Sequence, residues 1–316
     1  MEVLFWILGI TALLLLCAYG AYWKTFYHSR RRPEDIYEMP KRAPEELVTR
    51  TRGLIREFDA VKFESVEIRS EDGLRLFGRY YHVADGAPLH IQFHGYRSYA
   101  MRDFCGGNPL VRSCGHNTLV VDQRAHGKSE GHTIAFGIKE KRDCLLWVEY
   151  ACRRFGKETP IFLSGVSMGA ATVLMATELP LPENVVGVIA DCPYSSPRAI
   201  IRRVAGKMGF PVPLAYPFVV VGAFLFGGIT GLADEGAVRA VKRARVPILI
   251  IHGEADTFVP CEMSREIAAV CASPVRLETF PDADHAMSYM SDYERYRQIS
   301  VEFAEACLKN FHNKEQ

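Results

Sequence analysis

Ser167, Asp256 and His285 are the residues whose types and settings best suit chemistry. Ser167 lies in a Gly-x-Ser-x-Gly motif at 165–169, between a short apolar run and a helical pattern of small residues. This order predicts a strand, a sharp strained turn and a helix, with the Ser167 hydroxyl exposed above a sheet. Because a serine hydroxyl is a poor nucleophile at neutral pH, Ser167 needs a base.

The base and its partner each follow an apolar run of their own. Residues 247–251 lead to Asp256, and Val275–Phe280 leads to His285. We expect His285 to take the serine proton and return it to the leaving group, and Asp256 to orient the imidazole and stabilise its cation. Three other acids in the same loops remain alternatives to Asp256: Glu254, Asp282 and Asp284.

A fourth apolar run supplies the expected oxyanion hole. Leu89–Phe93 reads as a buried strand and ends in His94-Gly95-Tyr96. The backbone N–H of Tyr96 and that of Met168, the residue after the nucleophile, would then point at a developing oxyanion.

A further loop carries a resemblance to a known family. Residues 122–131 read Asp-Gln-Arg-Ala-His-Gly-Lys-Ser-Glu-Gly. This is similar to the Asp-x-Arg-Gly-x-Gly-x-Ser loop of the α/β-hydrolase superfamily, from which it departs at Ala125. The chain resembles that superfamily from about residue 61 to its C-terminus, and more narrowly its single-pass, membrane-anchored bacterial hydrolases. The chain order Ser, Asp, His agrees with that scaffold. The resemblance implies a serine hydrolase with an α/β-hydrolase fold and fixes no substrate.

Strands alternate with helical segments through this region. The expected strands are 89–93, 118–122, 161–164, 186–191, 247–251 and 275–280, and the expected helices are 44–58, 102–114, 138–155 and 293–311. An Asp72-Gly73 turn predicts a hairpin before them. The pattern predicts a mostly parallel sheet with helices on both faces and a site at the carboxyl ends of the strands. The predicted core comprises 61–194 and 244–312.

The segment 195–243 interrupts this rhythm and is predicted to form a helical cap. Residues 210–232 within it are almost uncharged, but Pro211, Pro213 and Pro217 argue against a straight membrane span. We expect the segment to cover the active site as a lid, with Phe224 and Phe226 contacting apolar acyl groups. The alternatives are a cap that buries only itself, or one that touches the bilayer.

The N-terminus is predicted to anchor the chain in a membrane. Residues 3–23 contain no charge and would form a helix of roughly 31 Å, long enough to cross a bilayer core. The basic residues follow this run: Lys24, Arg30, Arg31, Arg32, Lys41 and Arg42. The positive-inside rule then places the catalytic domain in the cytoplasm, with 24–60 as a juxtamembrane linker and helix. A cleaved signal peptide is the alternative.

Composition narrows the function classes. The net charge of +1 gives no sign of a nucleic-acid partner, and the nine scattered cysteines suit a reducing compartment. No ligand spacing or phosphate loop suggests a metal or cofactor, and nothing fixes the oligomeric state. We therefore expect a hydrolase of esters or thioesters with apolar acyl groups, acting through an acyl-enzyme on a small-molecule or lipid-like substrate. The alternatives are a peptidase or amidase on the same triad, and a non-catalytic binding protein of the same fold.

Overall fold

One eight-stranded sheet forms the centre of the molecule in the computed structural model, which describes residues 1–29, 37, 45–233 and 236–314. The strand order is β1–β2–β4–β3–β5–β6–β7–β8. The strands are β1 Glu64–Arg69, β2 Arg75–Tyr81, β3 Leu89–Phe93, β4 Asn117–Asp122, β5 Ile161–Val166, β6 Val185–Asp191, β7 Ile248–Gly253 and β8 Val275–Phe280. β1 and β2 are antiparallel, β2 is antiparallel to β4, and the other pairs are parallel. The predicted mostly parallel sheet and the hairpin at Gly73 are confirmed.

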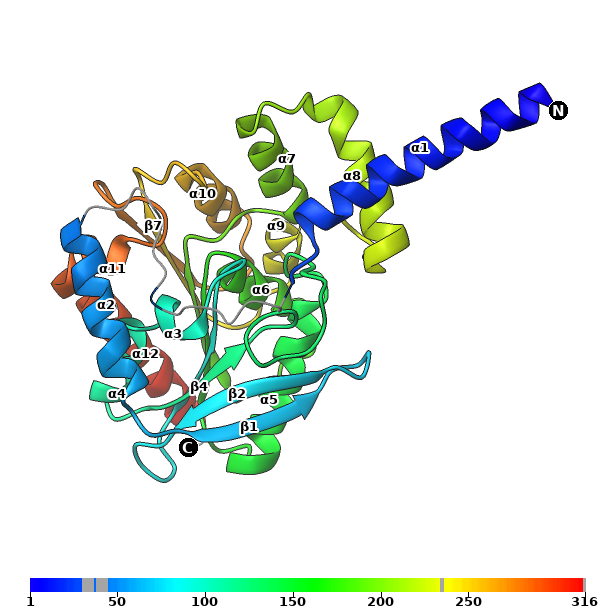
Figure 1. The fold of residues 1–316 in the computed structure, drawn as a ribbon. Coiled ribbons are helices and arrows are strands. Elements are labelled where there is room, and N and C mark those ends of the chain that lie inside the picture. The colour runs from blue at the N-terminus through cyan, green and yellow to red at the C-terminus, as the bar shows by residue number, and fades with distance from the viewer. Residues whose placement is uncertain (30–36, 38–44, 234–235, 315–316) are drawn as a thin grey trace.

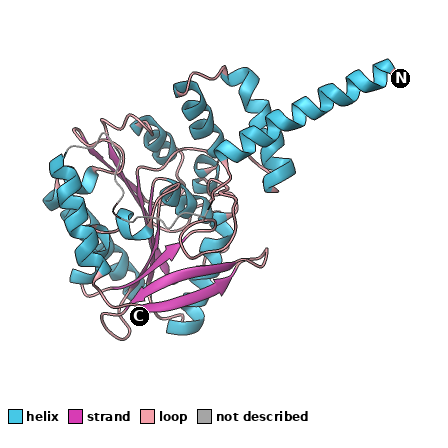
Figure 2. Cartoon of the chain, viewed as in Figure 1, coloured by secondary structure: helices cyan, strands magenta, loops and turns pink. Residues whose placement is uncertain are grey.

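Helices cover both faces of the sheet, as predicted (Figures 1 and 2). One face packs against α5 (Glu140–Phe155), α6 (Met168–Ala176), α9 (Ala237–Val241) and α10 (Cys261–Ala269). The other packs against α4 (Gly107–Ser113) and α12 (Tyr293–Lys314). Three further helices, α2 (Glu45–Asp59), α3 (Ala100–Asp103) and α11 (Ser288–Ser291), lie beside this second layer.

The single helix predicted over 102–114 is wrong, because the segment is divided into α3 and α4. Gly106 lies at the division, and a Cβ atom there would approach a ring carbon of Tyr289 to 2.3 Å. The tertiary contact with Tyr289 therefore requires glycine at this point. Tyr289 is distant from Gly106 in the sequence, so the local pattern around Gly106 does not reveal this contact.

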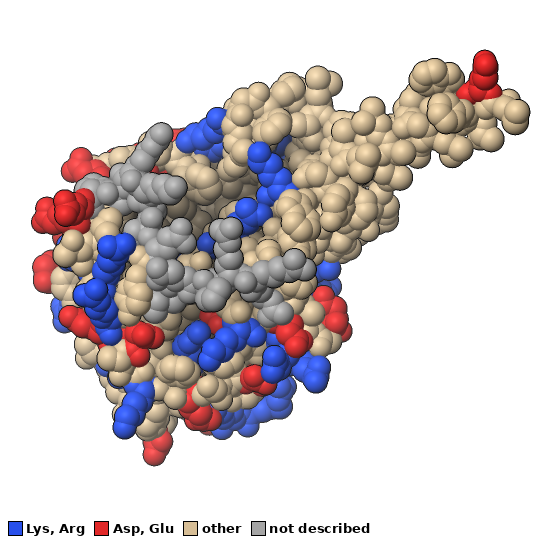
Figure 3. Space-filling model, in the orientation of Figure 1, with Lys and Arg blue, Asp and Glu red and all other residues tan. Residues whose placement is uncertain are grey.

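The N-terminal helix α1 (Glu2–Thr25) projects from the body and is long and apolar enough to cross a membrane (Figure 1). It carries almost no charge, and basic side chains gather where it meets the body (Figure 3). Of the basic residues that predicted its orientation, Lys24 is described. The others, Arg30, Arg31, Arg32, Lys41 and Arg42, lie outside the described residues.

The insertion at 195–243 is helical and packs against α1. It contains α7 (Pro197–Lys207), α8 (Val212–Gly227) and α9. A Cβ atom at Gly222 of α8 would lie 2.2 Å from the Ala18 carbonyl oxygen, so the two helix backbones approach as closely as glycine allows. Tyr22 and Phe26, at the C-terminal end of α1, are buried between this insertion and the body.

Candidate active site

Ser167 stands at a sharp turn between β5 and α6. Its φ of 54° is strained for a residue with a side chain. The turn is possible because the flanking elements nearly touch: a Cβ atom at Gly165 would lie 2.3 Å from the Gly169 carbonyl carbon, and one at Gly169 would lie 1.8 Å from the Phe93 oxygen. The two motif glycines thus let the chain present the Ser167 hydroxyl at the carboxyl edge of the sheet.

The structure brings Ser167, His285 and Asp256 together from three separate loops. The Nε2 atom of His285 lies 2.9 Å from Ser167 Oγ, and its Nδ1 atom lies 2.7 Å from Asp256 Oδ2. His285 is therefore hydrogen-bonded on both sides. If Nδ1 carries the proton and donates it to the carboxylate, Nε2 is free to accept from the serine hydroxyl.

Asp256 is held as a carboxylate by four donors. Its Oδ1 atom accepts from the backbone N–H groups of Phe258 at 2.8 Å and Val259 at 2.7 Å. Its Oδ2 atom receives His285 and lies 3.3 Å from His252 Nε2. Burial alone would raise the pKa of Asp256, but the hydrogen bonds from His252, His285 and the backbone hold that pKa well below its ordinary value.

His252 is a further site residue, and the sequence analysis assigned it no catalytic role. It is fully buried beneath Asp256 and bonds both the Ser264 hydroxyl at 2.6 Å and the Val259 carbonyl at 2.9 Å. These contacts fix the loop that presents Asp256. Its position at the end of β7, four residues before Asp256, was the available signal.

The three alternative acids have other settings. Glu254 forms an ion pair with Arg265 at 3.0 Å, and Asp284 Oδ1 accepts the backbone N–H of Thr257 at 2.9 Å. Asp282 is exposed at the edge of the site. Asp256 is thus the carboxylate of this group that contacts the His285 ring.

The loop after β3 lies beside Ser167 and carries Tyr96. A Cβ atom at Gly95 would be 3.4 Å from Ser167 Cβ, and the Gly95 N–H donates to Asp103 Oδ2 at 2.7 Å. The Tyr96 ring stacks on Phe136, with ring centroids 4.9 Å apart. Met168 opens α6, so its N–H has no intrahelical acceptor. Both N–H groups assigned to the oxyanion hole therefore belong to segments that border Ser167.

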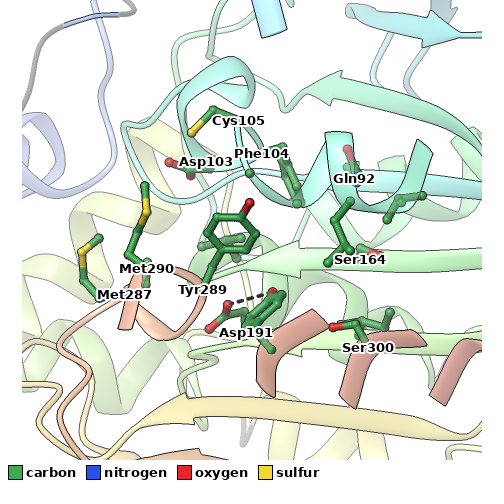
Figure 4. Close-up of a pocket in the computed structure, with 18 of the residues that line it drawn as sticks. Gln92, Asp103, Phe104, Cys105, Ser164, Asp191, Met287, Tyr289, Met290 and Ser300 are labelled. Atoms are coloured by element: carbon green, nitrogen blue, oxygen red, sulfur yellow. Dashed lines mark hydrogen bonds between the residues drawn. The ribbon is translucent and has the colours of Figure 1, made fainter. Parts of the chain in front are cut away.

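A cavity of about 1140 Å³ opens at Ser167 and His285 and runs between α4 and α12. Its mouth is bordered by α2, Phe258 and Met290, and its interior reaches Gln92, Ser164 and Asp191 (Figure 4). This volume exceeds the roughly 300–1,000 Å³ of ordinary small-molecule sites. The molecule therefore has room for a substrate considerably longer than an acetyl ester.

Phe224 and Phe226 do not lie where the lid prediction requires. Neither is among the described residues that line the cavity. Phe224 is 60% exposed on α8, and the Phe226 ring packs on Tyr19 of α1, with centroids 5.1 Å apart. The apolar segment 210–232 therefore packs against α1 and does not cover Ser167.

One group of metal-ligating side chains occurs among the described residues, and it overlaps the site. Cys192, Asp256 and His285 place one ligand atom each within 4.8 Å of one another. Burial raises the pKa of the Cys192 thiol well above its ordinary value, which disfavours the thiolate that binds metals. Asp256 and His285 are already hydrogen-bonded to each other. The group therefore suits proton transfer better than metal binding.

Comparisons with known proteins identify relatives of the chain. Residues 93–299 match the model of the alpha/beta hydrolase family. The uncharacterized protein YqkD of Bacillus subtilis is 27% identical over 198 residues, which is 61% of this chain and 64% of that protein, so the match spans slightly less than two thirds of its length. The lysophosphatidylserine lipase ABHD12 of Danio rerio is 24% identical over 52% of this chain and 41% of its own. The solved structure of the Pyrococcus furiosus esterase Pf2001 aligns with a TM-score of 0.63 and 22% identity, covering 90% of this chain and 98% of the esterase.

Proposed function

The chain belongs to the alpha/beta hydrolase family, and we propose that it is a membrane-anchored serine hydrolase that cleaves carboxylic ester or thioester bonds. The observation that carries the proposal is the continuous hydrogen-bonded line from Ser167 Oγ through His285 to Asp256. It joins the hydroxyl of a strained serine that lines the cavity to a base and to a buried carboxylate.

In the proposed reaction, His285 Nε2 takes the Ser167 proton as Oγ attacks the substrate carbonyl carbon. The resulting imidazolium is stabilised by Asp256, whose low pKa keeps it ionised. The N–H groups of Tyr96 and Met168 donate to the oxyanion. His285 then protonates the leaving alcohol or thiol, and an acyl group remains on Ser167. Water, deprotonated by His285, attacks the acyl-enzyme to release the acid and restore Ser167.

Esters are favoured over peptides by the shape and chemistry of the cavity. The cavity is deep and its helix-side wall is largely apolar, which suits an acyl chain. The names of the zebrafish lipase and the Pyrococcus esterase are consistent with ester substrates. A lipid-like ester would reach the cavity from the membrane that α1 is proposed to cross.

We further propose that α1 stays attached, with the catalytic domain on the cytoplasmic side. Phe26 is fully buried and Tyr22 nearly so, and cleavage after the apolar run would separate this packed end from its anchor. The nine cysteines are all free, which suits a reducing compartment. A mature N-terminus located after Trp23, or labelling of Cys114 in intact cells by a membrane-impermeant thiol reagent, would contradict this arrangement.

The full chain in detergent micelles provides the test. A fluorophosphonate should label the wild type, and Ser167→Ala should abolish both labelling and hydrolysis of para-nitrophenyl butyrate. Asp256→Asn should lower kcat by about 10⁴-fold, because the imidazole would favour the wrong tautomer. Glu254→Gln is the matched control and should stay near wild type. Labelling that persists in Ser167→Ala would refute the nucleophile. Wild-type protein that is folded but neither labelled nor active would favour the non-catalytic binding protein, and faster cleavage of anilides than of esters would favour an amidase.

A further inference from the structure

The cavity continues below Ser167 along a wall of unexpected polarity. β3 contributes His90 and Gln92 to this wall, and β5 contributes Ser164. All three side chains are buried. Strands covered on both faces normally carry near-continuous apolar side chains, because polar groups there lose their contact with water. Protein partners satisfy part of this stripe, since Asn108 Nδ2 donates to Gln92 Oε1 at 3.0 Å and His90 Nε2 is hydrogen-bonded to His116 Nδ1. The sheet side of the cavity is nevertheless polar.

Two buried polar atoms of residues that line the cavity have no hydrogen-bond partner among the described residues. They are Asp191 Oδ1, at the carboxyl end of β6, and Ser300 Oγ, on α12. The other Asp191 oxygen accepts from the Tyr296 hydroxyl at 3.1 Å. Ser300 follows Tyr296 by four residues on α12 and therefore lies on the same face of that helix. Figure 4 shows Asp191, Ser164 and Ser300 around one space, each from a different element.

Leaving such atoms unsatisfied is unfavourable. A buried donor or acceptor without a partner costs roughly 1–3 kcal/mol, and more when it is charged. Native proteins retain few of them, and usually where a ligand or ordered water completes the bonding. Asp191 is only 5% exposed and lines the cavity, and its Oδ1 atom is buried there without a partner among the described residues.

The opposite wall carries apolar side chains beside the polar Arg102, Asp103 and Ser113 of α3 and α4. Phe104 and Leu110 come from the α3–α4 side, and Met287 and Tyr289 come from the segment around α11. The interior is thus amphipathic along its length, with these apolar side chains on one side and the polar sheet wall on the other. A carbon chain that carries a polar substituent matches both walls, whereas a plain hydrocarbon chain would leave the sheet side unsatisfied.

The charges around the inner part of the cavity favour a ligand group that is neutral and donates a hydrogen bond. Burial lowers the pKa of His90 and of His116, so both are neutral near pH 7, and His90 Nε2 lies 3.0 Å from His116 Nδ1. The cationic side chains that line the described cavity are Arg102, which is bonded to the Ser98 hydroxyl, and the exposed Arg297. With an acceptor oxygen at Asp191 and neither of these arginines bonded to it, a carboxylate or phosphate is disfavoured and a hydroxyl is favoured.

We propose that the deep cavity binds a hydroxyl group carried along the acyl chain of the substrate, with Asp191 Oδ1 accepting its proton and Ser300 Oγ donating to its oxygen. The inference rests on the proposed hydrolase function, because the ester carbonyl must lie at Ser167 while the chain runs inward. It makes the substrate class hydroxyacyl esters, and it gives Asp191 and Ser300 a role in specificity.

The test compares kcat/KM of the full chain in detergent for a set of matched esters. The substrates are para-nitrophenyl decanoate and a series of hydroxydecanoates in which the hydroxyl moves stepwise toward the chain end. We expect one position to raise kcat/KM roughly tenfold over decanoate, which is the effect of one hydrogen bond to a charged group. Ser300→Ala and Asp191→Asn should each reduce that ratio to within about twofold of unity. Ser65→Ala, on the exposed strand β1, is the matched control and should preserve the ratio.

The outcomes separate this inference from the proposed function. If the wild type hydrolyses decanoate and is labelled at Ser167 but shows no preference at any hydroxyl position, the deep cavity holds only water and the inference is wrong. A preference that survives in both Ser300→Ala and Asp191→Asn would also overturn it. If no ester is cleaved and no serine is labelled, the proposed function itself fails. Thermal midpoints of the variants show whether each remains folded.

Discussion

The C-terminal end of α1 is hydrogen-bonded to the loop that carries Tyr96, and we expect this contact to control turnover. The Tyr96 hydroxyl donates to the Thr25 carbonyl at 2.8 Å. The Arg97 guanidinium donates to the Lys24 carbonyl at 3.0 Å and to the Tyr27 carbonyl at 2.9 Å. The proposed membrane helix and the proposed oxyanion hole are therefore in direct contact. The perturbation is Tyr96→Phe combined with Arg97→Ala, which removes these three bonds and keeps every backbone N–H.

The expected magnitude follows from the strain in the loop. Arg97 has a φ of 48°, and such a conformation costs about 1–3 kcal/mol in a residue with a side chain. Three hydrogen bonds contribute roughly 3 kcal/mol together, which is similar to that strain. Two other restraints remain in the variant: the Arg97 N–H donates to His126 Nε2 at 3.0 Å, and the Gly95 N–H donates to Asp103. We therefore expect kcat to fall about 10- to 100-fold in the double variant and about fivefold in Tyr96→Phe alone. Complete loss of an oxyanion donor costs about 10²–10³-fold and sets the upper limit.

The assay is para-nitrophenyl butyrate hydrolysis by the full chain in detergent, with kcat and KM determined separately. KM should change little, because Tyr96→Phe keeps the ring that lines the cavity and Arg97 is not among the described lining residues. Tyr216→Phe is the matched control, since its hydroxyl also donates to a backbone carbonyl, that of Leu232 at 3.2 Å, but within the insertion. The reasoning is refuted if the double variant keeps its thermal midpoint and kcat stays within twofold of wild type, or if KM alone rises. The first result would mean that Asp103 and His126 hold the loop without α1.

Two further predictions concern stability and the insertion. Burial raises the pKa of Asp191 to about 6, above its unfolded value of about 3.8, so the folded state binds the extra proton and stability must fall as the pH rises from about 4 to 6. Asp191→Asn lacks this titration, so its thermal midpoint should rise relative to that of the wild type as the pH increases from about 4 to 6. The corresponding change in the difference in unfolding free energy is up to about 3 kcal/mol. A difference that does not vary with pH would contradict the buried carboxyl. Because Phe224 and Phe226 lie outside the cavity, changing both to Ser should leave the dependence of kcat/KM on acyl length unchanged from butyrate to decanoate. A flattened profile would restore their role as a lid.

Local patterns were sufficient to predict the strands and the residues that end them. The strand 89–93 was predicted at its observed bounds, and the apolar runs before Asp256 and His285 became β7 and β8. This works because a buried parallel strand is a short apolar run, and its carboxyl end must change composition where the chain leaves the core. The Gly-x-Ser-x-Gly spacing then identified Ser167, since the close approach of β5 and α6 admits only glycine on either side.

Side-chain contacts between segments distant in the sequence were harder to predict. His252 could be placed at a strand end, but its position beneath Asp256 depends on the path of the loop at 254–260. In the predicted strand 89–93, the polar residues His90 and Gln92 alternate with Leu89, Ile91 and Phe93. This alternation indicates one polar face, which became a wall of the cavity. That signal was easily missed, because such alternation ordinarily indicates a solvent-exposed face. Only the helices α4 and α12 show that this face is enclosed.

The apolar segment 210–232 shows why the rest could not be predicted. Its composition requires an apolar surface, and the chain offers two: the substrate cavity and α1. Composition cannot choose between them, because the hydrophobic effect is non-directional and depends only on the area removed from water. The choice is made by shape. Gly222 on α8 allows contact with the backbone at Ala18, and the Phe226 ring finds Tyr19 and Tyr22 beside it. Once α8 lies on α1, the insertion leaves the cavity mouth to α2 and Met290. The apolar face of α8, with Leu214, Phe224 and Leu225 exposed, then lies alongside the helix proposed to enter the membrane.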